Sequence, residues 1–556
     1  MYRLCLRGAI CLLTAVLTAC GTGRPADLIL VAGRIFTADP DRPFVQALAV
    51  RGNRIASLGD STAILRRAGA GTDIRRYPDA LAVPGFNDAH VHFLDGGLGL
   101  AGVQLRSAHD RYDFRDRIVS FAAGLEAGEW ILRGNWDHEA WPDHAHPTRQ
   151  LIDPVTPDHP VFVTRLDGHI SLANSLALEL AGVTADTPDP EGGEIVRDPV
   201  TGEPTGILID TAQDLVYDVI PANSDDTVRR GLLAASRHAS QVGVTSIQDN
   251  ADRQIWRVYE QLRAEGLLTV RVNAWYPIAL RDTLAAEGIA GPSGDEWLQR
   301  GTVKIFSDGS MGAGSAWFFE PYTDEPSTSG LAIIAPAELT RLITAADALG
   351  LQVATHAIGD RANAVTLDAY AAARAANPDR RTERRHRIEH AQVLRDSDLE
   401  RFQELGIIAS IQPSHAIDDM RWAEARIGTE RCRIAYRVGS FFEAGIPVAF
   451  GTDWFVEPLD PRLGLYAAVT REFPAGGPEG GWFGEERITL AEAITAYTAG
   501  SAWAESMEHI KGRLQRGYLA DIAVFAGDLF ASQPRDWLKT PVILTIVDGK
   551  VVYEGS

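Results

Sequence analysis

Short apolar segments separated by turn residues characterise both ends of the chain. Near the N-terminus they lie at residues 28–31, 33–37, 47–50 and 54–58, and near the C-terminus at residues 518–525 and 542–553. Segments of this length, bounded by Gly, Asn and Asp, are typical of β-strands joined by tight turns. Because these β-rich ends flank an α/β middle, we predict that residues 20–83 and 506–556 together form one small β-sandwich.

The middle of the chain, residues 84–505, alternates helical spacing with short apolar runs. Counting the run at 80–83 that leads to His90 as the first, eight barrel strands are predicted, the others lying at 243–249, 268–275, 303–306, 352–356, 387–390, 407–411 and 447–453. Eight strands alternating with helices predict an α/β fold of the TIM-like (β/α)8 type, whose chemistry gathers at the carboxyl ends of the strands. A doubly wound open sheet is the structural alternative.

The first and second predicted barrel strands are separated by residues 94–241. This connection is too long for a plain crossover helix. It contains further apolar segments, at 130–137, 160–164 and 192–196. We therefore interpret residues 94–241 as a cap inserted into the barrel.

Two histidines, His90 and His92, follow the first apolar run. In an extended strand, side chains two residues apart point to the same side, so the pair is able to hold one metal ion. Alone, the pair is more typical of a polar strand edge or turn. The context changes this interpretation, because four more residues of suitable chemistry lie in or at the end of later predicted strands: Lys304, His356, His390 and Asp453. Singly these would be core histidines or helix caps, but together they predict convergence on one point.

The order HxH, Lys, His, His, Asp resembles that of the amidohydrolase superfamily of metal-dependent hydrolases. The longer strings resemble its third family, which includes formamide deformylases: PGFNDAHVHF at 84–93, VKIFSDG at 303–309, THAIGDRA at 355–362, RIEHAQ at 387–392 and GTDW at 451–454. The resemblance covers nearly the whole chain after the leader, including residues 168–175 and 193–206.

The resemblance implies a site for one or two divalent metal ions, zinc or an allied ion. His90 and His92 would bind one ion, His356 and His390 a second, and Asp453 would contact the first. In relatives with lysine on the fourth strand, reaction with carbon dioxide gives a carbamate (a carboxylated lysine) that bridges two ions. An ammonium has no lone pair to offer a metal. The alternative for Lys304 is a free lysine beside a single ion, bonded within the strand or holding an anionic substrate.

We hypothesise a hydrolase that cuts a non-peptide carbon–nitrogen bond of a small amide by means of metal-activated water. Asp453 would be the catalytic residue, accepting the proton of the water and passing it to the departing nitrogen. His415 and His169 are the predicted substrate-binding residues. An aminoacylase or a cyclic-amide hydrolase is the alternative within enzymes, and a non-catalytic binding lipoprotein is the alternative outside them. Deamination is disfavoured, because residues 357–359 offer no Glu after His356.

Composition limits the partners of the chain. The 556 residues carry 53 Lys and Arg against 74 Asp and Glu, a formal net charge of −21. Such a charge argues against nucleic acid or anionic lipid head groups as partners. It agrees with a soluble protein that handles small molecules, but charge alone does not name the amide-type substrate, and it leaves open whether the chain forms a homodimer.

The first 19 residues resemble a lipoprotein signal peptide. Arg3 and Arg7 precede an apolar run at 9–17 that is too short to span a bilayer. Residues 17–20, LTAC, resemble a bacterial lipobox, so cleavage would leave Cys20 as the lipid-modified first residue. A plain signal peptide cut at a small-residue site is the alternative. An Asp directly after Cys20 would indicate retention in an inner membrane, but Gly21 stands there. We therefore expect lipid anchoring to the outer membrane of a bacterial cell envelope, facing the periplasm.

The remaining cysteines predict a fold without disulfides. Cys5 and Cys11 would leave with the signal peptide, and Cys20 would carry lipid. Cys432 then has no partner within the mature chain, so the fold must rest on its apolar core.

Overall fold

A computed structural model of the chain describes residues 24–380 and 383–555. The predicted signal peptide (1–19) and Cys20 lie outside the described residues. Within them, no helix is both long and apolar enough to span a bilayer. Cys432 is buried as a free thiol, and burial raises its pKa to about 12.

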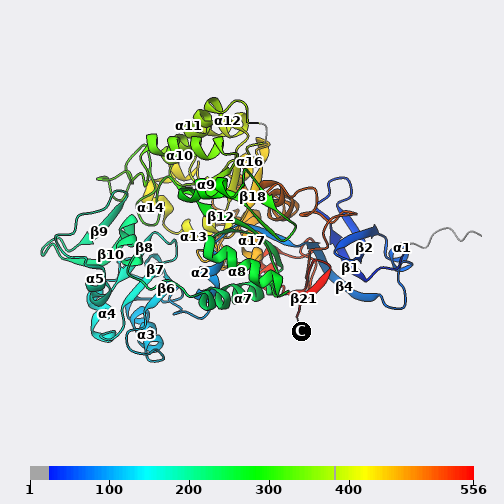
Figure 1. Cartoon of the computed structure of the whole chain (residues 1–556), viewed down its shortest axis with the longest axis horizontal. Helices are drawn as coiled ribbons and strands as arrows, with labels where there is room; N and C mark the ends of the chain where they lie inside the picture. Colours follow the sequence, from blue (N-terminus) through cyan, green and yellow to red (C-terminus); the bar gives the residue numbers. More distant parts are fainter. Residues whose placement is uncertain (1–23, 381–382, 556) are drawn as a thin grey trace, which may run out of the picture.

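A barrel of eight parallel strands forms the centre of the molecule (Figure 1). In order around the barrel the strands are β5 (Phe86–Val91), β11 (Val244–Asn250), β12 (Arg271–Pro277), β14 (Leu298–Phe306), β15 (Gln352–Ala357), β16 (Arg387–His390), β17 (Ile408–Ile411) and β18 (Val448–Phe450). A short strand, β13 (Ser293–Gly294), pairs with the edge of β14. The predicted (β/α)8 barrel is therefore confirmed.

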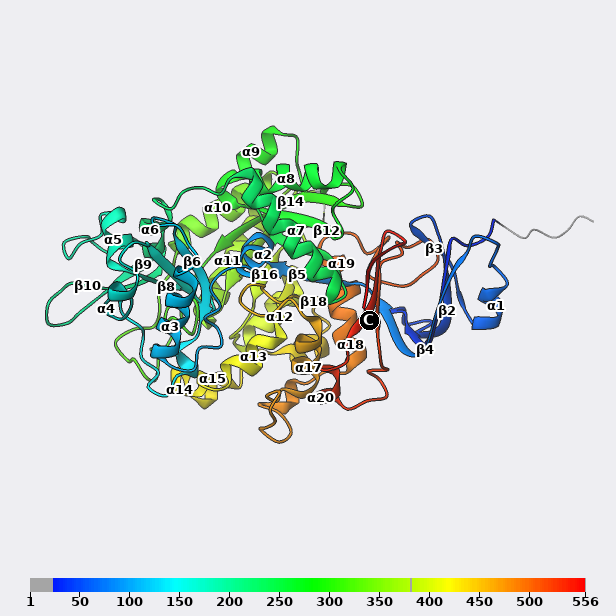
Figure 2. The same ribbon diagram turned by 90° about the horizontal axis from the view of Figure 1, so that it is seen from below.

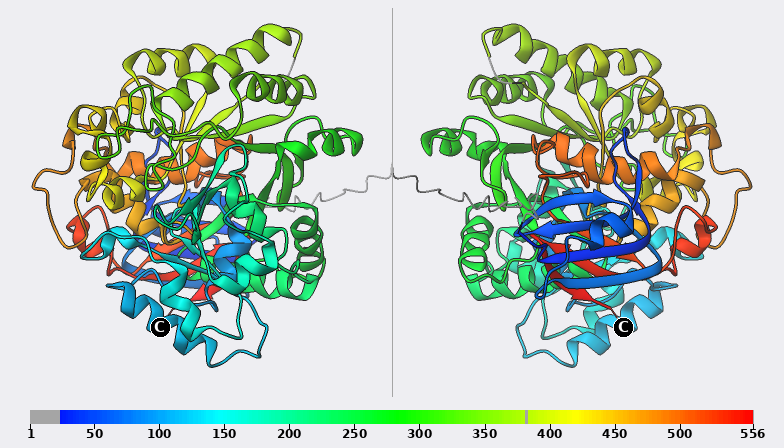
Figure 3. Two further views of the ribbon diagram at one scale, coloured as in Figure 1. Left: turned by 90° about the vertical axis from the view of Figure 1, so that its left-hand side faces the viewer. Right: turned by 90° about the vertical axis from the view of Figure 1, so that its right-hand side faces the viewer.

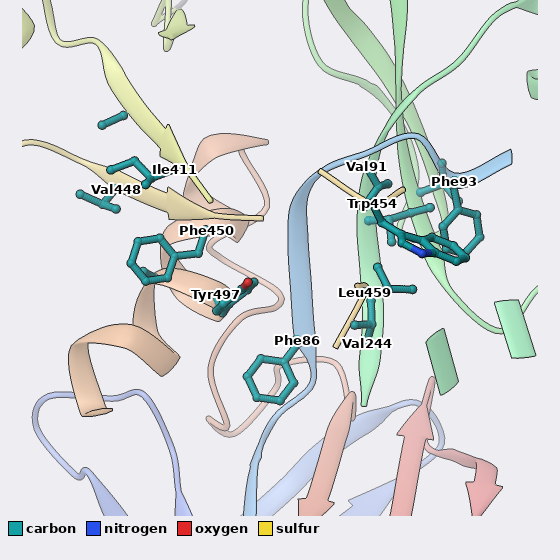
Figure 4. Close-up of a cluster of buried hydrophobic side chains, with 14 of the residues drawn as sticks. Phe86, Val91, Phe93, Val244, Ile411, Val448, Phe450, Trp454, Leu459 and Tyr497 are labelled. Atoms are coloured by element: carbon teal, nitrogen blue, oxygen red, sulfur yellow. The ribbon is translucent and has the colours of Figure 1, made fainter. Parts of the chain in front are cut away.

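The barrel closes between its first and last strands. A parallel bridge joins Val91 at the end of β5 to Trp454, just beyond β18. Below it, Tyr497 of the helical turn η6 (Ala496–Gly500) packs edge-on against Phe86 and Phe450, with ring centroids 5.9 and 5.4 Å apart (Figure 4). Apolar packing thus seals a seam that has few ladder hydrogen bonds, and the open doubly wound sheet is excluded.

Helices surround the barrel strands. The main ones are α2 (Phe93–Gly99), α7 (Asp225–Gln241), α8 (Arg253–Ala264), α10 (Pro336–Ala348), α11 (Asp360–Ala376), α12 (Asp396–Leu405), α16 (Val438–Glu443) and α17 (Pro461–Thr470). Polar caps begin several of them: the side chains of Ser224 and Asp252 accept backbone N–H groups in the first turns of α7 and α8. The apolar faces of these two helices bury Leu232 and Tyr259 against the strands.

Both ends of the chain build one seven-stranded sheet. Its order is β21 (Lys550–Glu554), β20 (Val542–Val547), β19 (Ile522–Phe525), β4 (Asp73–Pro84), β1 (Leu28–Phe36), β2 (Phe44–Arg51) and β3 (Arg54–Gly59). The sheet curls so that its two edges approach, and Asn53 in the β2–β3 turn donates a hydrogen bond to Asp548 in the β20–β21 turn (3.0 Å). Strands from the two ends face one another across a shared core, the predicted sandwich (Figure 2).

Two strand predictions at the N-terminal end were wrong. The segments 28–31 and 33–37 form one strand, β1, which has a register shift between Val31 and Ile35. The run 80–83 belongs to β4 of the terminal sheet and is not the first barrel strand. The chain passes from one sheet to the other at Gly85, where a Cβ atom would overlap the side chain of Thr245. The barrel strand that carries His90 therefore starts only at Phe86.

The connection between β5 and β11 contains a sheet of its own. Five strands lie in the order β6 (Ile131–Trp136), β7 (Val161–Arg165), β8 (Ile170–Ala173), β10 (Pro204–Asp210) and β9 (Gly193–Arg197), flanked by α3 (Arg111–Ala122) and α5 (Ser175–Ala181). This inserted sheet and the terminal sheet lie at opposite ends of the barrel (Figures 1 and 3). The helix α7 that ends the connection packs against α2 in the outer layer of the barrel.

A buried ion pair fastens the terminal sheet to the barrel. Arg271 on β12 donates two hydrogen bonds to Asp521 (2.7 and 3.0 Å), next to β19, and a third to Asp548 (3.1 Å). Arg271 is 1% exposed. We expect Arg271→Ala to lower the free energy of unfolding by about 3 to 5 kcal/mol, because the buried Asp521 and the half-buried Asp548 lose their cation.

Urea denaturation of the wild type and the variant measures this difference. Arg75→Ala is the matched control, since Arg75 pairs with Asp73 and Glu554 on the exposed part of the same sheet. Its loss should cost less than about 1 kcal/mol. Equal effects of the two variants would contradict a fastening role for Arg271.

Candidate metal centre

Three predicted ligands come together at the carboxyl end of the barrel. The Oδ1 atom of Asp453 lies 3.5 Å from Nε2 of His90 and 3.3 Å from Nε2 of His92. Donor atoms of the three side chains all lie within 4.8 Å of one another. Asp453 Oδ1 is buried and has no hydrogen-bond partner among the described residues. Two imidazoles and one carboxylate, with a buried oxygen that lacks a partner, fit a divalent metal ion.

Backbone contacts place Asp453 beside the histidines. Asp88 accepts hydrogen bonds from the backbone N–H and the hydroxyl of Thr452 (2.9 and 2.6 Å), and the Asp453 N–H donates to the carbonyl of His90 (2.7 Å). Asp453 itself has φ +57°, a conformation that costs free energy outside glycine. The loop after β18 is therefore held in a strained turn that directs Asp453 toward the end of β5.

The other two predicted ligands lie next to this group. The ring of His390 is centred 5.3 Å from that of His90, and the ring of His356 lies 4.5 Å from that of His390. His390 bonds through Nδ1 to Gln412 Oε1 (2.8 Å), and His356 bonds through Nε2 to the carbonyl of Gly309 (3.1 Å). The other nitrogen of each ring has no hydrogen-bond partner among the described residues. Burial lowers the pKa of both imidazoles well below the usual value, so they are neutral, as metal ligands must be.

Lys304 extends from β14 into the middle of the cluster. Its Nζ lies 2.9 Å from Nε2 of His90, and the residue is 5% exposed. Burial lowers the pKa of Lys304 to about 8. The structure thus brings all six predicted ligand residues to one end of the barrel.

The sequence analysis missed a group of buried charged residues that lies behind the metal ligands. Glu389 lies 3.0 Å from Nδ1 of His90 and 2.5 Å from Nε of Arg387. Burial alone would raise the pKa of Glu389, but Arg387 and His90 outweigh it and lower the pKa to about 2. The Glu389 carboxylate therefore lies against Nδ1 of the His90 ring, whose Nε2 faces Asp453. The available signal was strand alternation, which turns Glu389 away from its neighbour His390.

We expect Glu389→Gln to weaken metal binding by about 10- to 100-fold, because the His90 imidazole loses the carboxylate that orients it. Competition with a fluorescent chelator measures the affinity. Asp398→Asn is the matched control, since Asp398 is equally buried but binds Arg395 at the start of α12. Unchanged metal affinity in Glu389→Gln, in a variant with the wild-type circular dichroism spectrum, would contradict this role.

A cavity of about 510 Å³ opens above the cluster. The ligand residues lie in its wall with both predicted substrate-binding residues, His415 and His169. His415, on α13 (Pro413–Asp419), stacks on His390 with ring centroids 5.9 Å apart, and its buried Nε2 has no partner among the described residues. His169 comes from the inserted sheet, and its Nδ1 lies 2.5 Å from Oδ1 of Asp210.

The remaining cavity wall carries apolar, acidic and basic side chains, the basic ones being Arg133 and Arg165 of the inserted sheet. The inserted sheet and the residues that follow it contribute Leu132, Phe162, Leu166, Tyr217 and Ile220. The barrel side adds the carboxylates of Asp418, Asp419 and Glu457. Glu457 is paired with Arg106 (2.8 Å) and Asp418 with Arg421 (2.8 Å). A small organic molecule with an apolar arm fits this enclosure.

Comparison with known proteins agrees with this geometry. Protein LONG AFTER FAR-RED 3 of Arabidopsis thaliana is 37% identical over 544 residues, which cover 96% of this chain and 92% of that protein. N-substituted formamide deformylase of Arthrobacter pascens is 26% identical over 555 residues, covering 95% and 99%. The crystal structure of an uncharacterised metal-dependent hydrolase from Pyrococcus furiosus is 31% identical, covers 90% of this chain and 99% of its own, and superposes with a TM-score of 0.70.

The model of the amidohydrolase family matches residues 79–553, which include every predicted ligand. The relatives and the ligand cluster point to the same class of metal-dependent hydrolase. The chain belongs to the amidohydrolase family.

Proposed function

We propose that the chain hydrolyses the carbon–nitrogen bond of a small amide that is not a peptide, with divalent metal bound by its histidines and Asp453. The observation that carries the proposal is Asp453 Oδ1, buried without a partner among the described residues and within 3.5 Å of Nε2 of both His90 and His92. A carboxylate in such a place either binds a cation or accepts a proton, and hydrolysis of an amide needs both functions.

The proposal assigns His90, His92 and Asp453 to a first ion, and His356 and His390 to a second. Zinc is the proposed metal, since imidazole nitrogens and carboxylate oxygens are among its usual ligands in proteins. When bound, such an ion polarises a carbonyl group and lowers the pKa of water toward neutrality. Asp453 then acts as the base that takes the proton of the attacking water and returns it to the departing nitrogen.

The proposed substrate is an N-acyl or N-formyl amide with an apolar substituent. The deformylase of Arthrobacter pascens, named for N-substituted formamides, supports the amide class. The apolar wall formed by Phe162, Tyr217 and Ile220 supports the substituent. The size of the substrate is limited by the cavity of about 510 Å³, which suits a molecule of drug size or smaller.

Metal analysis and a substrate panel test the proposal together. Chain loaded with zinc, and chain stripped by a chelator, would be assayed on N-formyl amines, N-acyl amines, N-acyl amino acids, cyclic amides and dipeptides. We expect turnover of N-formyl or N-acyl amines by the zinc-loaded chain alone. Preference for N-acyl amino acids or cyclic amides would replace the proposed substrate class. A chain that holds no metal and binds panel members without hydrolysing any would overturn the enzyme and support a binding protein.

A further inference from the structure

The inserted sheet brings one histidine–carboxylate pair to the wall of the cavity. His169 lies in the turn between β7 and β8, and Asp210 ends β10, the neighbouring strand. Their side chains meet at 2.5 Å, between Nδ1 and Oδ1. The Asp210 side chain is fully buried, whereas that of His169 is 14% exposed and lines the cavity. The Asp210 carboxylate is therefore buried, and the His169 imidazole is the group of the pair that reaches the cavity.

Backbone contacts hold the pair rigidly. The Asp210 N–H donates to the carbonyl of His169 (2.9 Å), and Gln213 Nε2 donates to the carbonyl of Gly168 (3.1 Å). Asp210 adopts φ +48°, which costs free energy for a residue with a side chain. Such conformations persist where the surrounding structure imposes them, and they are frequent at functional sites.

The barrel loop after β14 packs closely against the pair of His169 and Asp210, next to the metal centre. A Cβ atom at Gly309 would lie 2.6 Å from Oδ2 of Asp210, so only glycine allows the loop after β14 to approach so closely. The carbonyl of Gly309 accepts the hydrogen bond of the proposed ligand His356 (3.1 Å). Ser310, next in the loop, donates to Asp167 Oδ2 in the same turn as His169 (2.6 Å). The ring of His169 is thereby centred 5.2 Å from that of His356.

The orientation of the ring distinguishes His169 from a histidine of purely structural role. In the buried pair His386 and Asp347, Nε2 faces the carboxylate (3.0 Å) and Nδ1 accepts the Val353 N–H (3.0 Å), so protein groups engage both nitrogens. In His169 only Nδ1 is engaged by the described residues, and Nε2 has no hydrogen-bond partner among them. A group supplied by a bound substrate would complete the bonding of Nε2.

We propose that His169 contacts the substrate through Nε2 at the scissile amide, and that Asp210 is a positioning residue that holds this ring. The inference deepens the proposed amide hydrolysis and rests on it. Under this proposal the inserted sheet covers the reaction centre and also contributes a residue to it. In serine hydrolases, a carboxylate on one imidazole nitrogen likewise fixes the orientation of the ring and the function of the other nitrogen.

Single and double variants test the pair, on the best substrate of the panel and with metal content measured in each. We expect His169→Ala to lower kcat/KM by about 10²- to 10³-fold, as for loss of one hydrogen-bonding group at a reacting centre. Asp210→Asn should lower it by about 10- to 100-fold, as for loss of a residue that orients another. The double variant should be no slower than His169→Ala, because the carboxylate acts only through the ring.

Two controls separate the positioning role from a structural one. His109 and Asp113 form a similar pair (2.7 Å) on the exposed surface of the same insertion, so His109→Ala and Asp113→Asn should keep wild-type kcat/KM. Nitrogen-15 NMR of the histidines should show the Nδ1 signal of His169 move in Asp210→Asn while the signals of the metal-binding histidines stay. Should Asp210→Asn fail to fold, His169→Gln takes its place, with activity expected between wild type and His169→Ala.

The outcomes are separable. Wild-type kcat/KM in His169→Ala overturns the substrate contact, and loss of metal from that variant replaces it with a ligand role. A double variant whose loss is the product of the two single losses overturns the positioning role of Asp210. A wild-type chain that hydrolyses no panel member overturns the proposed function, and this inference with it.

Discussion

Asp453→Asn is expected to lower kcat by about 10³-fold while leaving most of the bound metal in place. Asparagine keeps an oxygen where Asp453 Oδ1 lies, 3.3 Å from Nε2 of His92, but it cannot accept the proton of water. The histidines His90 and His92, together with His356 and His390, remain to hold metal. Loss of turnover without loss of metal therefore isolates the function of the base from that of the ligand.

The measurement pairs kinetics with metal content of the same preparation, determined by mass spectrometry after dialysis. Asp460→Asn is the matched control: Asp460 lies in the same connection after β18, where it caps α17, and it does not line the cavity. We expect the control to keep kcat. Full activity in Asp453→Asn would remove the proposed base, and parallel loss of metal and activity would reduce Asp453 to a ligand.

Much of this site could be predicted because, in a barrel, the order of the strands along the sequence determines where the ends of the strands lie. A residue at the carboxyl end of any barrel strand lies near the residues at the ends of the others. His90, His356, His390 and Asp453 each end or follow such a strand, and the structure brings them together as expected. Local patterns sufficed because each strand is short and its end is marked by a change from apolar to polar residues.

Residues that orient the ligands were harder to predict, because their partners are distant in sequence. Glu389 reaches His90 across the barrel, and Asp88 reaches Thr452 across the closing seam. Asp210 approaches His169 only because β8 and β10 are neighbours in the inserted sheet. A lone buried carboxylate carries no periodic signal, so these contacts require strand order, which apolar patterning does not specify.

The boundary between the two sheets was misplaced for a related reason. Residues 80–86 form nearly continuous β-structure, and the apolar run 80–83 lies in β4, whereas β5 holds the polar residues Asn87, Asp88 and His90. The change of sheet occurs at Gly85, whose N–H donates to the carbonyl of Asp521 at the far end of the chain (2.9 Å). A single glycine between two adjoining strands does not show which partner each strand will take.

Replacement of Lys304 by arginine is expected to remove one metal ion and to lower kcat by about 10³-fold, if the proposed carbamate bridges two ions. Nζ of Lys304 lies 2.9 Å from Nε2 of His90, the nitrogen assigned to the first ion. A protonated Nζ would occupy that lone pair and repel a dication. With its pKa lowered to about 8, a useful fraction of the amine is neutral near pH 7 to 8 and able to react with carbon dioxide. Such a carbamate would replace the cation at Lys304 by an anion that attracts metal.

Arginine keeps the positive charge of the side chain but forms no such carbamate, and Lys304→Met tests the effect of removing the charge. Metal content should fall from two ions to one in both variants, whereas Arg300→Lys, four residues earlier on β14 and outside the cavity, should keep both ions. Carbon-13 NMR of wild-type chain under labelled carbon dioxide should show one carbamate signal that both Lys304 variants lack. A wild-type chain with one ion and no such signal would leave Lys304 a free amine, and amide hydrolysis would then depend on the ion held by His90, His92 and Asp453 alone.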